Sequence, residues 1–163
     1  MNGITVTLRA LHHGEKRLAG ELLAVADRHR TDHEVHHVAT DLAHWSREHV
    51  RELARAGHEH GLDLDDSSGT TLSGLLSGVR RTAAEAVGRR PEPGLLLLRD
   101  LRELHLDATA NSLHWEMLAQ VAQATKNEAL LDLVSRCHPQ TLRQMRWTNT
   151  MIKVLSPQIL SSL

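Results

Sequence analysis

The chain has 163 residues, of which 40% are hydrophobic and 24% are charged, and its formal net charge is -1. This length suits one domain with its own core, residues 1–163, and the near-neutral charge gives no electrostatic case for binding nucleic acid. No apolar run approaches the roughly 18 residues of a membrane span, and the single Cys137 excludes an internal disulfide and fits a reducing compartment, so we expect a cytoplasmic protein that contacts neither a membrane nor nucleic acid.

The first part of the chain predicts an antiparallel helical hairpin over residues 8–57. Apolar residues recur at steps of three and four over residues 8–25, as in an amphipathic helix, and a second such series covers residues 35–53. Thr31 followed by Glu34 is a capping-box signature, which places the start of the second helix there. A connection this short makes the two helices antiparallel neighbours.

A long connection, residues 58–93, follows the first hairpin. Residues 61–69 are polar and predict a loop. Residues 72–87 carry apolar side chains at helical spacing and predict a short helix. Pro91 and Pro93 then mark the entry to the next long helix.

The second half predicts another antiparallel hairpin, residues 94–155. Its two apolar series are separated by Thr125-Lys126-Asn127-Glu128, a second capping box. Pro139 lies inside the last series and is expected to kink or break that helix, because proline lacks a donor and clashes with the preceding turn. The residues after Leu155 are expected to form a short tail. The fold class is therefore an all-α four-helix bundle of two hairpins joined by a long crossover.

One acid and one base interrupt the apolar series of the first hairpin. Residues at one level of an antiparallel hairpin have a constant index sum, and Leu22 with Leu42 sums to 64, as does Glu15 with His49. Because either side chain is costly to bury alone, the two must be paired, hydrated or bound to a metal. A structural buried pair, a metal site and a proton-transfer site all remain open, and His12 at the edge of the series is a further candidate ligand or partner of a ligand.

These residues resemble part of a known family. The stretches Leu11–Leu18 and Ser46–Leu53, with a Glu on one helix and a His on the next, resemble half of a rubrerythrin-like or stress-induced bacterial protein of the ferritin-like superfamily. The resemblance implies a crossover-linked bundle in which two such half-sites hold two iron or manganese ions and react with oxygen or peroxide.

The second hairpin departs from that family pattern. The level that matches Glu15 and His49 is expected to hold Ala108 and Thr109 opposite Arg143 and Gln144, none of which is a carboxylate or an imidazole. A dinuclear centre needs several carboxylates. The expected centre is therefore partial or vestigial, with Fe, Mn or Zn as the ions that its ligands suit.

Ten of the 13 histidines lie in the first 60 residues, and two of them form a second candidate site. His33 and His37 are four residues apart on the face of their helix that points away from the apolar series, a spacing that lets two imidazoles chelate one metal ion. A solvated face with incidental metal affinity is the alternative. Glu34 and His37 also form a literal Glu-x-x-His, but it lies in the first turn of a helix, where Glu34 serves the cap.

The patterns and the resemblance together favour a ferritin-like protein with a partial or vestigial metal centre, which acts in binding or in a stress-associated role, with no catalytic residue assigned. A metal-dependent oxidoreductase whose site is completed across a homodimer is one alternative. A helical module that binds a protein partner is another. Self-association of the bundle as a homodimer is expected.

Overall fold

The computed structural model describes residues 2–66 and 92–163, which form four α-helices and no strand. The helices are α1 (Gly3–Arg28), α2 (His33–Glu59), α4 (Pro93–Ala124) and α5 (Glu128–Ser161). The all-α bundle predicted from the sequence is confirmed. None of the helices in these two ranges is long and apolar enough to cross a membrane.

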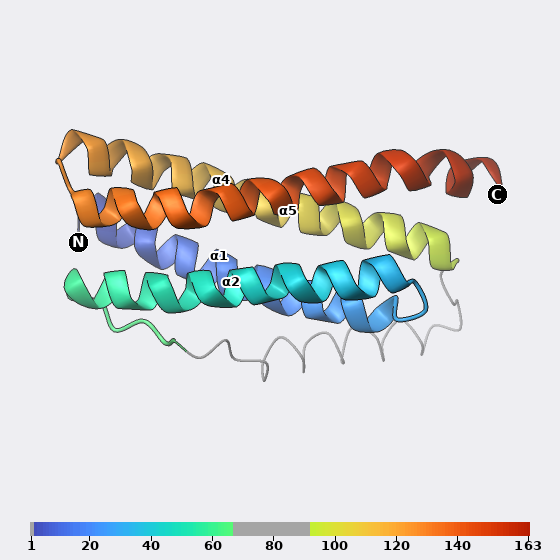
Figure 1. Ribbon diagram of the computed structural model, residues 1–163, viewed down its shortest axis with the longest axis horizontal. Coiled ribbons are helices and arrows are strands. Elements are labelled where there is room, and N and C mark those ends of the chain that lie inside the picture. The colour runs from blue at the N-terminus through green and yellow to red at the C-terminus, as the bar shows by residue number, and fades with distance from the viewer. Residues whose placement is uncertain (1, 67–91) are drawn as a thin grey trace.

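The four helices lie side by side as two antiparallel hairpins, α1 with α2 and α4 with α5 (Figure 1). Helix α1 also packs on α4, and α2 approaches α5 less closely. Helix α2 ends at one end of the bundle and α4 begins at the opposite end (Figure 1). The expected helix at residues 72–87 and the last residues of the polar loop lie outside the described residues.

Asparagine and aspartate, rather than the expected threonines, cap two of the helices. Asp32 caps α2 and Asn127 caps α5, and each side chain accepts a hydrogen bond from the backbone N–H three residues later. The predictions of Thr31 and Thr125 as caps are wrong, and Thr125 instead ends α4. Both capping boxes therefore located the turns correctly but missed the capping residue by one or two positions.

Two helix ends differ from the sequence prediction. Helix α1 begins at Gly3 rather than near Leu8, with Asn2 as its cap. Helix α5 is continuous through Pro139 and ends at Ser161, so the expected break and the expected short tail are both wrong. Pro139 deprives only one carbonyl of its donor, that of Ser135, a residue exposed to water.

The core consists of two hydrophobic clusters with a polar layer between them. One cluster lies toward the α1–α2 turn and the other toward the α4–α5 turn. Between them every helix buries polar side chains at adjacent levels. We call this set the central polar layer; its members are Glu15, Ser46, His49, Asn111, Ser112, Thr141, Gln144 and Thr148. Buried polar groups need hydrogen-bond partners or a bound ligand, so the central polar layer is the candidate location of a functional site.

Helices α1 and α4 pack tightly at Gly14, beside this layer. A Cβ atom added to Gly14 would lie 2.1 Å from Oδ1 of Asn111, a side chain that is itself buried. We expect Gly14→Ala to lower the free energy of unfolding by about 1–3 kcal/mol through overpacking. Chemical denaturation should show that this loss is smaller when Gly14→Ala is made in an Asn111→Ala background, since the clash is then removed. Equal losses in the two backgrounds would contradict the close contact.

Candidate functional site

The structure brings Glu15 and His49 together in the interior. Nδ1 of His49 lies 3.1 Å from Oε1 of Glu15, and the two side chains are 1% and 0% exposed. The atoms are within ion-pair distance, but their approach lacks hydrogen-bond geometry. The index sum of the hairpin therefore predicted the level of this pair correctly.

The orientation of the His49 ring is held from α5. Nε2 of His49 lies 2.7 Å from Oε1 of Gln140. Since a carbonyl oxygen only accepts, Nε2 carries the proton and donates it. Nδ1 then faces a carboxylate oxygen across 3.1 Å, and two lone pairs repel at that distance. Protonation of Nδ1, or a metal ion bound by both atoms, would relieve this repulsion.

Glu15 is held by the second hairpin through neutral donors. Nε1 of Trp115 donates to Oε1 of Glu15 over 3.0 Å, and Oγ1 of Thr141 lies 3.5 Å from the same oxygen. The other oxygen, Oε2, is buried and has no hydrogen-bond partner. A buried carboxylate oxygen with no donor is costly in a dry interior, so Oε2 is available to a ligand.

The pKa of His49 is raised. Burial acts against this by lowering it, but contact with the Glu15 carboxylate and the bond to Gln140 outweigh burial. The imidazole ring of His49 also makes an edge-to-face contact with the indole ring of Trp115, with ring centroids 5.8 Å apart. Contact with Glu15 therefore favours the protonated form of the buried His49 ring.

The groups that face the pair from the second hairpin are not those expected. They are Trp115, Gln140 and Thr141, rather than Ala108 and Thr109 opposite Arg143 and Gln144. The second hairpin is displaced along the bundle axis relative to the prediction, because a long connection leaves its position free. Gln144 still lies close by, donating to the Leu42 carbonyl and to Ser46.

The side chain of His12 contacts the backbone of the segment that follows α2. Its Nε2 lies 2.6 Å from the backbone oxygen of Asp65, in the segment that follows α2. Burial lowers the pKa of His12, and the bond to Asp65 offsets this in part. Within residues 2–66 and 92–163, no three His, Cys, Asp or Glu side chains gather closely enough to hold a metal ion. Glu15 and His49 thus lack a third protein ligand of these types there.

His33 and His37 are exposed at the start of α2, as the sequence predicted. Their rings are nearly parallel, with an interplanar angle of 12° and centroids 6.1 Å apart. His37, the nearer of the two, lies twelve residues from His49 along α2, which corresponds to about 18 Å of helix. The two candidate sites are therefore separate.

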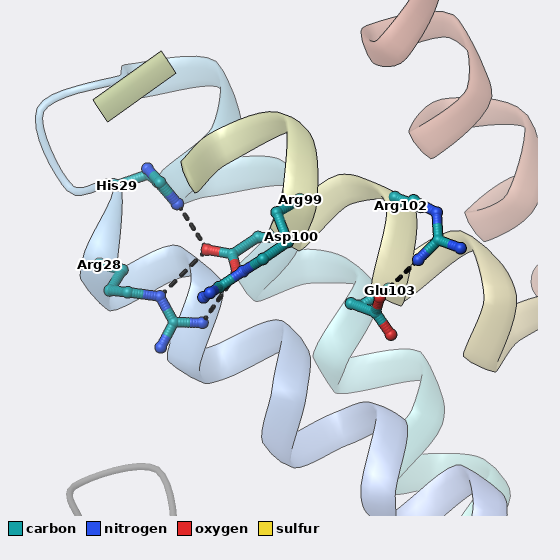
Figure 2. Close-up of polar contacts among 6 residues, drawn as sticks. All are labelled: Arg28, His29, Arg99, Asp100, Arg102 and Glu103. Carbon is teal, nitrogen blue, oxygen red and sulfur yellow. Dashed lines mark hydrogen bonds and ion pairs between the residues drawn. The ribbon is translucent and has the colours of Figure 1, made fainter. Parts of the chain in front are cut away.

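A buried ionic cluster that sequence reasoning missed surrounds Asp100 (Figure 2). Asp100 of α4 is 5% exposed, and its Oδ2 accepts from Nε2 of His29 at 2.7 Å and from Nε of Arg28 at 3.0 Å. Nη2 of Arg99 lies 3.6 Å from Oδ1 of Asp100. His29 is itself only 9% exposed, because α4 covers it. The cluster ties the end of α1 to the start of α4.

The pKa of Asp100 is lowered. Burial alone would raise it, but the hydrogen bonds from His29 and Arg28 outweigh burial. One signal in the sequence could have found this residue. Asp100 stands between Leu97 and Leu101 in an apolar series, where a lone carboxylate requires a cationic partner.

Cys137 is an inert core residue. It is buried in the same cluster as Trp115. Burial raises the pKa of the Cys137 thiol to about 12, and the nearby Glu15 carboxylate adds to the effect. The thiolate that nucleophilic chemistry needs is therefore scarce at neutral pH.

Comparison with known protein families, with curated proteins and with solved structures finds no match for this chain. Its class is accordingly defined by its own fold and site: an all-α bundle with an acid–base pair in a central polar layer.

Proposed function

We propose that this protein is a metal-binding bundle of the ferritin-like type with a partial centre, in which Glu15 and His49 hold one divalent transition-metal ion. The connectivity supports the type, since α2 and α4 run in the same direction and begin at the same end of the bundle (Figure 1). The 3.1 Å separation of Oε1 and Nδ1 carries the proposal. Two ligand atoms at about 2.1 Å from one ion, at octahedral or tetrahedral angles, lie about 3.0–3.4 Å apart.

The surroundings of the pair fit ligation. A ligating imidazole usually donates its other N–H to an acceptor, as His49 Nε2 does to Gln140. A ligating carboxylate is usually hydrogen-bonded as well, as Glu15 is by Trp115. The unpartnered Oε2 of Glu15 is a further oxygen donor. A mixed nitrogen and oxygen site of this kind suits Zn²⁺, Mn²⁺ or Fe²⁺.

Binding, rather than turnover, is the role that this site supports. The second hairpin supplies Trp115, Gln140 and Thr141, which are neutral, so bridging carboxylates for a second ion are missing from the described residues around the pair. An oxidoreductase completed across a homodimer is less well supported, because Glu15 and His49 are fully buried and residues of a second copy reach them only if the bundle opens.

Metal titration of untagged protein tests the proposal. Trp115 contacts Glu15 directly, so its fluorescence should report binding, and paramagnetic Mn²⁺ or Fe²⁺ should quench it under anaerobic conditions. We expect one ion at the interior site of each chain. Glu15→Gln and His49→Gln should each weaken binding at least about 10-fold, whereas His33→Ala/His37→Ala should leave the interior site unchanged. Protein that binds no ion with a Trp115 response at millimolar metal contradicts the proposal.

Self-association through the outer face of α4 is a second candidate function. Leu106, Ala110, Leu113 and Met117 are exposed and lie at successive steps of four, three and four residues, which places them in one stripe. The steps of four, three and four residues are the same when the helix is followed in either direction. An antiparallel second copy therefore sets Leu106 against Met117 and Ala110 against Leu113, as a two-fold interface requires.

Sedimentation measures this directly. We expect a dimer for the wild type and a monomer for Leu113→Glu. The matched control is Leu142→Glu, which changes an exposed leucine of α5 outside the stripe and should leave the dimer intact. A wild type that stays monomeric at high concentration rules the interface out.

A further inference from the structure

Three imidazoles meet in the first turn of α2. His33 and His37 lie with parallel rings, and the His36 ring meets that of His37 edge-on, with centroids 5.2 Å apart and planes at 69°. His33 and His37 are exposed, whereas His36 is half-buried. The turn therefore concentrates metal-ligating nitrogen atoms at the surface, far from the central polar layer.

His36 is anchored and His37 is not. Nδ1 of His36 lies 2.8 Å from the backbone oxygen of Ala26, and because a carbonyl only accepts, Nδ1 carries the proton. This bond ties the first turn of α2 back onto α1. The ring of His36 is held in place beside that of His37. The exposed rings of His33 and His37 can turn toward a shared ion.

We propose that His33 and His37 form a second metal site, on the surface, which takes one late divalent ion of the first transition row: Cu²⁺, Ni²⁺ or Zn²⁺. Imidazole nitrogen suits these ions, and hard ions such as Mg²⁺ and Ca²⁺ prefer oxygen. The described residues supply no third ligand of the His, Cys, Asp or Glu types, so water completes the coordination sphere.

The local charge favours a cation despite the helix end. The amino-terminal end of α2 carries a partial positive charge, which opposes metal binding. Two carboxylates flank His33 in the chain, Asp32 as the cap and Glu34 in the first turn. Their charge offsets the helix dipole, which amounts to only about half an elementary charge.

Calorimetric titration of the untagged full chain with Ni²⁺ at pH 7.5 tests the site. We expect one exposed site whose affinity falls at least about 10-fold in His33→Ala and in His37→Ala. His44→Ala and His58→Ala remove exposed histidines of the same helix and should change nothing. Glu15→Gln should leave this site intact, so its result is separable from that of the interior centre.

NMR spectroscopy with paramagnetic Cu²⁺ identifies the ligands directly. Cu²⁺ should broaden the NMR signals of His33 and His37 first. The proposal is overturned if the double variant His33→Ala/His37→Ala binds Ni²⁺ as the wild type does, or if His36→Ala lowers affinity as much as His33→Ala.

Discussion

Asp100→Ala is expected to lower the free energy of unfolding by about 3 kcal/mol, because it removes the shared acceptor of a buried imidazole and a largely buried guanidinium. Chemical denaturation at pH 7 measures the loss. Glu103→Ala is the matched control, since Glu103 pairs with Arg102 at the surface of the same helix (Figure 2). Surface ion pairs contribute about 0–1 kcal/mol, so Glu103→Ala should change the free energy of unfolding very little. Equal effects of the two changes would show that Asp100 is not a buried anchor.

The Asp100 carboxylate should also affect how the free energy of unfolding changes at acidic pH. The pKa of Asp100 is lower in the folded state than in the unfolded state. Its contribution is therefore present above the unfolded value, about 3.9, and is lost as the pH falls through the folded pKa. We expect Asp100→Ala to flatten the decline of stability below about pH 4.

Glu15→Ala is expected to destabilise the metal-free protein by about 3 kcal/mol, because it strands a buried imidazolium. Denaturation in the presence of a chelator measures this. The double variant Glu15→Leu/His49→Leu should recover most of the loss, since apolar residues of similar volume often replace a buried ion pair without cost. A Glu15→Ala protein as stable as the wild type contradicts the buried pair.

The pH dependence of this pair has the opposite sign to that of Asp100. The pKa of His49 is raised on folding, so the pair contributes fully below the unfolded value, about 6.5. The contribution is lost as the pH rises through the folded pKa. Stability of the metal-free wild type should therefore decline above about pH 6.5. His49→Gln should abolish that decline, and a decline of unchanged size in His49→Gln would assign it to another group.

The amino-acid sequence by itself determined the four long helices, the positions of the two tight turns and the register within the first hairpin. A short turn leaves two amphipathic helices one way to pack, so the index sum that paired Leu22 with Leu42 also paired Glu15 with His49.

Tertiary structure alone decided what faces those residues. The register within each hairpin does not determine the level of one hairpin relative to the other, and Trp115 and Gln140, rather than Ala108 and Arg143, contact the acid–base pair. The partnership of Asp100 with His29 likewise joins residues 71 positions apart on α4 and at the end of α1. Local periodicity specifies which face of a helix is buried, but only the packing of one hairpin on the other specifies its neighbour.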